Sequence, residues 1–222
     1  MRTAKSAGRV TGILLLTQFL GLMIGFILLV PITTRAYLEN AATASPQVRL
    51  AVLLLFVTAL LTIAMSIFMF AYVREHCYKM SLWLLALSVV WCAMQAVDNE
   101  HILSLITLSQ QNVWGANDAV RLLGEAAHTS GRWTHYTELL VMDVWYFSFY
   151  LLLFRSALVP RALAAFALLT VIVHMAAIPL PVLLGYSSIL VFAYALLLSY
   201  LVMSGWLLVK GFNPNRTITA ET

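Results

Sequence analysis

The stretch LAVLLLFVTALLTIAMSIFMFAY, residues 50–72, contains no charged side chain. A helix needs about 20 apolar residues to cross the roughly 30 Å hydrocarbon core of a bilayer, because each residue adds about 1.5 Å. The stretch meets this length, and Arg49 and Arg74 lie just outside its two ends. It therefore predicts a transmembrane helix, and with it an integral membrane protein.

The composition of the whole chain indicates the same class. Hydrophobic residues make up 62% of the 222 residues and charged residues only 10%, against about 45–50% and about 25% in soluble domains. So few polar side chains cannot cover a water-soluble globule. The net charge of +4 is not gathered in a dense basic cluster. We therefore expect the lipid bilayer as a partner, and no nucleic acid.

Five further apolar segments complete the predicted fold, an all-α polytopic protein with a six-helix bundle in a single membrane domain, residues 1–222. The first segment is longer than the apolar part of a signal peptide, which favours an uncleaved transmembrane helix. Hydropathy places the six helices near residues 10–30, 50–72, 79–103, 133–154, 160–179 and 185–209.

The basic residues predict the orientation of these helices. Cytoplasmic loops of membrane proteins carry an excess of Lys and Arg. With both termini in the cytoplasm, four basic residues lie outside, namely Arg35, Arg49, Arg121 and Arg132. The other nine of the 13 are then cytoplasmic: Arg2, Lys5, Arg9, Arg74, Lys79, Arg155, Arg161, Lys210 and Arg216.

The connection between the third and fourth helices, about residues 104–132, is the longest. Asn117 and Asp118 can cap a short helix that ends near His128 and has an apolar stripe. We expect this helix to lie on the outer surface, either as an ordinary connector or as a lid.

A GxxxG motif, Gly21 to Gly25, lies in the first predicted helix. Its small residues permit close contact between helices. The contact can form inside the bundle or with a second copy of the chain, so a homo-oligomer is one alternative.

Polar side chains interrupt the predicted helices near their outer ends. Ionisable residues within a membrane usually face the bundle interior, where they serve ligands or protons. The alternative is that they simply contact water at the level of the lipid headgroups. The spacing on the third helix and the start of the fourth predicts an outward-opening polar pocket, with these as candidate ligand-binding residues: Trp91, Gln95, Asp98, His101 and His135.

Asp143 lies deeper, near the middle of the predicted bilayer. A charge there costs about 2.5–3.5 kcal/mol to insert, which favours a functional role. His174 of the fifth helix is a candidate partner and pocket residue, and Trp145 and Tyr146 can line the same pocket. Asp143 and Glu138 are candidate catalytic residues. They lie about 140° apart around their helix, so they cannot form one close pair.

A weaker alternative is a metal site formed by His101, His135 and His174. Three protein ligands and an open position for water are typical of catalytic zinc sites. The sequence contains no HxxxH or HExxH motif, so our main interpretation includes no metal, and the pattern identifies no cofactor.

Three stretches resemble a known family: GRVTGILLL (8–16), FRSALVPRALAAFALL (154–169) and WLLVKGFN (206–213). They are similar to the first-helix start, the turn between the fourth and fifth helices, and the C-terminal ending of the bacterial membrane family called domain of unknown function 4386. The resemblance implies a six-helix fold and a bacterial inner membrane. It implies no activity.

Three functions therefore stay open. The first is binding of a lipid-like or small amphiphilic ligand in the outward pocket. The second is a membrane-embedded enzyme acting on a lipid or prenyl substrate, either an acid-initiated cyclase or a metal-dependent hydrolase. The third is a proton-coupled transporter, although no helix is broken at mid-membrane as in many transporters.

Overall fold

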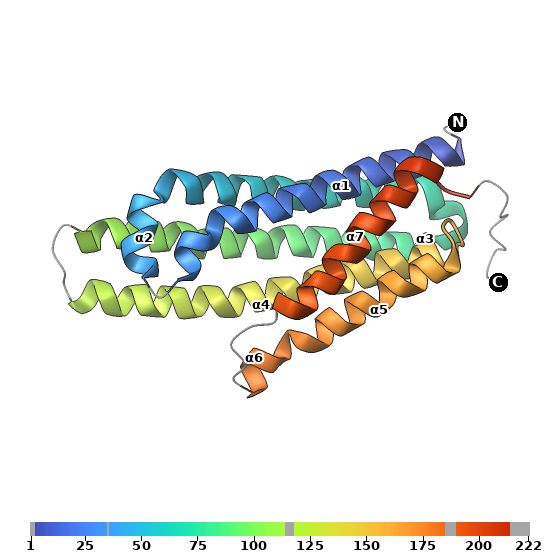
Figure 1. Ribbon diagram of the computed structural model, residues 1–222. Coiled ribbons are helices and arrows are strands. Elements are labelled where there is room, and N and C mark those ends of the chain that lie inside the picture. Colours follow the sequence, from blue (N-terminus) through green and yellow to red (C-terminus); the bar gives the residue numbers. More distant parts are fainter. Residues whose placement is uncertain (1–2, 35, 114–117, 185–189, 214–222) are drawn as a thin grey trace. The chain divides into compact units, whose positions relative to one another are not determined.

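The computed structural model describes residues 3–34, 36–113, 118–184 and 190–213 (Figure 1). The elements within these ranges are helical. In chain order they are α1 (Ala4–Leu29), the 3-10 helix η1 (Val30–Thr33), α2 (Tyr37–Thr43), α3 (Ser45–Val113), α4 (Asp118–Arg155), α5 (Arg161–Ala177), α6 (Pro179–Leu184) and α7 (Leu190–Lys210).

Six helical stretches are long and apolar enough to cross a membrane, which confirms the predicted number. The second and third predicted helices are the two arms of α3. They meet at Cys77, whose backbone is not helical (φ −133°, ψ 46°), and Figure 1 shows α3 turning back on itself between its two arms. The six stretches are Ala4–Thr33, Ser45–Glu75, Cys77–Gln111, Asp118–Arg155, Arg161–Pro181 and Phe192–Lys210.

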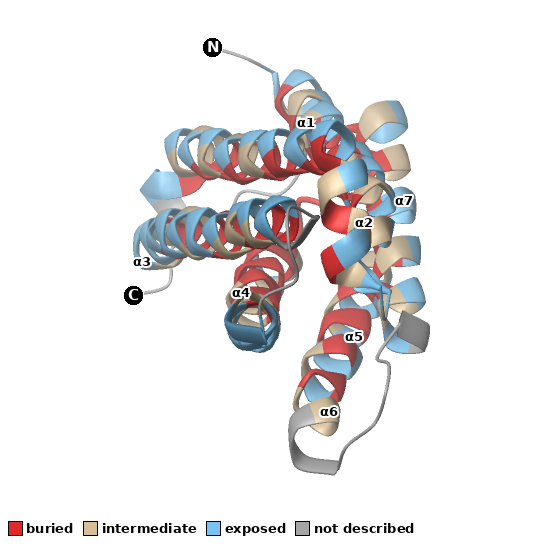
Figure 2. Ribbon diagram, turned by 90° about the vertical axis from the view of Figure 1, so that its left-hand side faces the viewer, coloured by how far each residue is buried: buried red, intermediate tan, exposed pale blue. Residues whose placement is uncertain are grey.

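The prediction of a separate short helix ending near His128 is wrong. That segment is the beginning of α4, which continues without a break to Arg155; Asn117 lies outside the described residues. The beginning of α4 is mostly exposed and its later part mostly buried (Figure 2). The His128 ring nevertheless stacks on Tyr37 of α2, with centroids 4.1 Å apart. The beginning of α4 therefore contacts α2, although most of it is exposed.

The chain divides into two compact units. Unit 1 comprises Met1–Phe19, Leu61–Trp91 and Leu139–Thr222, and unit 2 comprises Leu20–Leu60 and Cys92–Glu138. The boundaries fall inside helices, so α1, α3 and α4 each contribute to both units.

In unit 1, the three stretches that carry the family resemblance lie together. A Cβ at Gly8 would come closer than 3.0 Å to the amide nitrogen of Phe212, so only glycine fits there. Gly211 has a φ of 71°, a left-handed conformation that glycine adopts at helix ends without steric cost. Asn213 donates its amide hydrogen to Leu158 O at 2.9 Å and its side-chain Nδ2 hydrogen to Ala157 O at 3.1 Å. These motifs therefore hold α1, the α4–α5 turn and the end of α7 together.

In unit 2, an apolar core joins α1 and η1 to α2 and both arms of α3. The GxxxG glycines of α1 face α3, where a Cβ at Gly21 would collide with Thr58 and one at Gly25 would lie 2.7 Å from Leu55 Cδ2. The motif thus serves packing within the chain. The buried residues of this core are Leu22, Leu29, Ile32, Ala41, Val48, Ala51, Val52, Leu55, Ile102 and Ile106.

Candidate functional site

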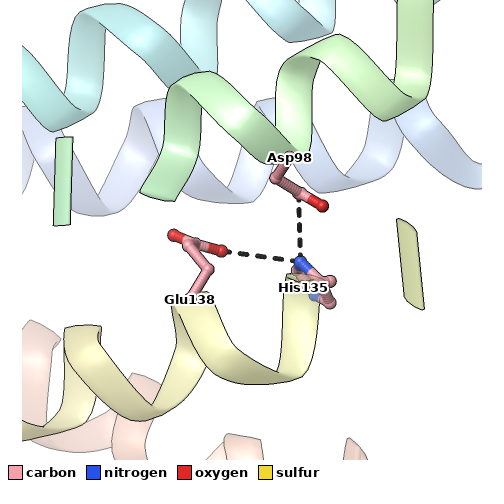
Figure 3. A group of neighbouring side chains, drawn as sticks. All are labelled: Asp98, His135 and Glu138. Carbon is pink, nitrogen blue, oxygen red and sulfur yellow. Dashed lines mark hydrogen bonds and ion pairs between the residues drawn. The ribbon is translucent and has the colours of Figure 1, made fainter. Parts of the chain in front are cut away.

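Two acidic side chains of unit 2 converge on one imidazole nitrogen. Asp98 projects from the second arm of α3, while His135 and Glu138 lie one turn apart on α4 (Figure 3). His135 Nδ1 is 3.3 Å from Asp98 Oδ2 and 3.5 Å from Glu138 Oε2. We call Asp98, His135 and Glu138 the acid–histidine cluster. The cluster brings together three of the predicted site residues from two helices.

Burial differs among the members of the cluster. The Asp98 and Glu138 side chains are 7% and 4% exposed, whereas the His135 side chain is 33% exposed. The His135 ring also contacts the Phe26 ring edge-on, with centroids 6.0 Å apart. The imidazole is thus held by two buried carboxylates and is itself partly exposed.

The neighbouring polar residues of α3 bond mainly among themselves and the backbone. Gln95 donates its Nε2 hydrogen to Asn99 Oδ1 at 3.1 Å, and Asn99 donates its Nδ2 hydrogen to Val52 O at 3.3 Å. Sequence reasoning missed Asn99, although its position one turn after Gln95 was the available signal. The bond from Asn99 to Val52 joins the two arms of α3, and the bond from Gln95 to Asn99 lies within the second arm. Both give buried polar groups the partners that they require.

His101 is half-buried and packs beside α4. A Cβ at Gly131 would lie 3.2 Å from His101 Cβ, so the glycine permits this close approach. Among the described residues, His101 is not one of the side chains grouped with His135 as potential metal ligands. The group that could hold a metal ion consists of Asp98, His135 and Glu138, whose ligand atoms all lie within 4.8 Å of one another.

Unit 1 contains a second acid–histidine pair. His174 Nδ1 of α5 is 2.8 Å from Asp143 Oδ2 of α4, which confirms the predicted partnership. The side chains are 4% and 0% exposed. A distance of 2.8 Å is typical of a charge-assisted hydrogen bond. Unlike the cluster of unit 2, this pair is enclosed, and its geometry ties α4 to α5.

Glu138 and Asp143 have different partners in different units, in keeping with their separation of about 140° around α4. Glu138 pairs with His135 one turn earlier, and Asp143 pairs with His174 on another helix. The two acids do not form one catalytic pair.

The predicted aromatic pocket residues form part of the core of unit 1. Trp91, Trp145 and Tyr146 are each at most 1% exposed. The Trp145 ring lies 5.9 Å from Trp91 and 4.9 Å from Tyr146, measured between centroids. Trp145 Nε1 donates a hydrogen bond to Ser66 Oγ at 3.0 Å, a partner that the sequence pattern did not single out. These rings pack against one another, and a ligand-binding role for them stays a prediction.

The described helices define a multi-pass α-helical membrane protein in which the acid–histidine cluster joins two helices of one unit. The family of the chain follows from its sequence. The model of a family described as a domain of unknown function, DUF4386, matches residues 10–211, and the chain belongs to this family. Comparison with curated proteins gave no match, and neither did comparison with solved structures.

Proposed function

We propose that this protein resides in the bacterial inner membrane and binds a small amphiphilic, lipid-like ligand through the acid–histidine cluster, on the side facing away from the cytoplasm. The distribution of basic residues supports this placement. The described residues predicted to be cytoplasmic belong to unit 1, namely Lys5, Arg9, Arg74, Lys79, Arg155, Arg161 and Lys210. Arg49, Arg121 and Arg132 belong to unit 2, the unit that contains the cluster.

The observation that carries the proposal is the unequal burial within the cluster. Buried carboxylates are costly in a membrane protein and usually serve ligands or ions. A purely structural tie has no need of an accessible member, and the Asp143–His174 pair shows such an enclosed arrangement. In the cluster, His135 is one-third exposed while both acids that hold it are buried. A ligand headgroup can therefore contact the imidazole without unfolding either helix.

The test is purification of the full chain in a mild detergent that retains native lipid, followed by mass spectrometry of bound molecules. We expect the wild-type protein to retain one class of amphiphile enriched over the membrane extract. Asp98→Asn and Glu138→Gln keep the side-chain shapes and remove the charges, so they should lose this enrichment. Glu100→Gln is the matched control, because Glu100 is an exposed acid close to Asp98 on the same helix.

Two results would contradict ligand binding at this site. One is the absence of any enriched amphiphile in the wild-type protein at several detergent concentrations. The other is equal enrichment in the wild type and in both cluster variants. The same variants should show unchanged helix content by circular dichroism, so that loss of ligand is not mistaken for loss of fold.

The geometry gives less support to an acid-initiated cyclase. A general acid must come within about 2.6–3.2 Å of the group that it protonates. The Asp143 side chain is fully buried and bonded to His174, and Trp145 and Tyr146 are covered by other rings. The pair therefore fits a tie between α4 and α5 better than it fits a substrate site.

A further inference from the structure

The two acid–histidine groups of this protein differ in their internal distances. In the Asp143–His174 pair, nitrogen and oxygen are 2.8 Å apart, the length expected for a hydrogen bond between charged groups. In the cluster, His135 Nδ1 is 3.3 Å from one carboxylate oxygen and 3.5 Å from the other. An imidazole nitrogen carries at most one hydrogen, so Nδ1 cannot donate well to both oxygens at once. The cluster is therefore not simply a second copy of the hydrogen-bonded pair.

These longer distances match the spacing of ligands around a small metal ion. Zinc binds histidine nitrogen and carboxylate oxygen at about 2.0–2.2 Å in tetrahedral geometry, so neighbouring ligand atoms lie about 3.4 Å apart. The two nitrogen–oxygen distances of the cluster fall on either side of this value. All three ligand atoms lie within 4.8 Å of one another, so small side-chain rotations can bring them around one ion.

The charges of the three side chains also favour a bound divalent cation. A metal ion binds carboxylates and imidazole in their deprotonated forms, in which two carboxylates and one imidazole together carry −2, the charge that a divalent cation neutralises. Because Asp98 and Glu138 are buried, this neutralisation lowers the cost of keeping both ionised in a membrane protein. One nitrogen and two oxygen ligands suit a divalent ion of borderline softness, such as Zn²⁺ or Mn²⁺, better than a soft ion that prefers sulfur.

We propose that Asp98, His135 and Glu138 form a site for a divalent transition-metal ion of the Zn²⁺ class, with a fourth coordination position that no described side chain of the cluster fills. Three protein ligands and one open position are the arrangement of catalytic zinc sites. The ligand set differs from the three-histidine set that the sequence suggested, and it retains only His135. The inference uses the same cluster as the proposed function, but it concerns a different ligand, so either can fail alone.

The test is metal binding by the full chain in detergent after treatment with a chelator. We expect Zn²⁺ to bind with a stoichiometry of about one, and the visible absorption of Co²⁺ to report a four-coordinate site. Asp98→Asn, His135→Gln and Glu138→Gln should each weaken Zn²⁺ binding by about 10- to 100-fold or more, since even loss of an outer partner of a metal ligand has this effect. Glu100→Gln, at an exposed acid outside the cluster, should leave the affinity unchanged.

The outcomes separate this inference from ligand binding. Two results would overturn the metal site. One is that the wild-type protein binds neither Zn²⁺ nor Mn²⁺ although its helices are folded. The other is that the wild type and the three cluster variants bind the metal equally. Retention of an amphiphile by the metal-free protein would leave the proposed function standing in that case. Conversely, Zn²⁺ binding that needs all three side chains supports the site, whether or not any amphiphile is found.

Discussion

Removing one member of the buried Asp143–His174 pair should destabilise the protein measurably. The variant His174→Leu keeps an apolar side chain of similar length on α5 and removes the imidazole that lies 2.8 Å from Asp143. The carboxyl group then stays in unit 1 without this partner. The matched changes are Asp143→Leu, which removes the acid instead, and the double variant, which removes both polar groups.

The expected size follows from two limits. Breaking a buried ion pair costs about 3–5 kcal/mol in soluble proteins, because it leaves a charge uncompensated. Polar interactions between transmembrane helices are weaker, averaging about 0.6 and reaching about 1.7 kcal/mol, because the unfolded state in the membrane also finds partners. The Asp143–His174 pair is short and almost fully enclosed. We therefore expect a loss between these limits, about 2–3 kcal/mol for His174→Leu.

The assay is reversible unfolding in mixed micelles, followed by circular dichroism and analysed as a double-mutant cycle. The double variant should lose less than the sum of the two single losses, because no polar group then remains that has lost its partner across the helices. Ser148→Ala is the control on α4, since the Ser148 hydroxyl bonds only the carbonyl of Val144 on its own helix among the contacts described. Additive losses in the cycle, or a single-variant loss below about 0.5 kcal/mol, would refute a stabilising interaction across the two helices.

The remaining predictions concern glycines that allow close contacts between helices. Gly8→Ala should lower the free energy of unfolding by about 1–3 kcal/mol, the usual cost of overpacking, because the new Cβ would collide with the backbone at Phe212. Gly205→Ala is the opposite case: nothing lies within 4 Å of its Cβ position, and alanine should stabilise α7 by up to about 1 kcal/mol. Gly21→Leu should weaken the α1–α3 contact at Thr58 without producing a change in oligomeric state by light scattering. Equal stabilities for the two alanine variants, or dissociation of a native dimer by Gly21→Leu, would contradict this description of the packing.

The number of membrane-crossing helices was predictable because it depends on the length of apolar runs. Residues 50–72 and 79–103 were identified as two separate spans, and the backbone does break between them at Cys77. Helix ends were less predictable. The start of α4 is polar, so the sequence predicts a separate segment there, but in the structure it is part of one continuous helix. A ring and two glycines of this part contact neighbouring helices.

The part of the candidate site that lies within one helix was predictable. The spacing of His135 and Glu138 places them one turn apart by helix geometry alone. Whether Asp98 or His101 of α3 meets them depends on how α3 packs against α4, and one turn separates the two choices. The structure places Asp98 beside His135 and His101 beside Gly131.

The sequence by itself determined six apolar stretches long enough to cross a membrane, and it marked the polar residues that such a chain has reason to bury. Both follow from local properties, namely the length of an apolar run and the cost of a charge in hydrocarbon. Only the tertiary structure decided that Asp98, and not His101, joins His135 and Glu138 in unit 2. The physical reason is that pairing across helices depends on the axial register and the rotation of the two helices, which no single helix encodes.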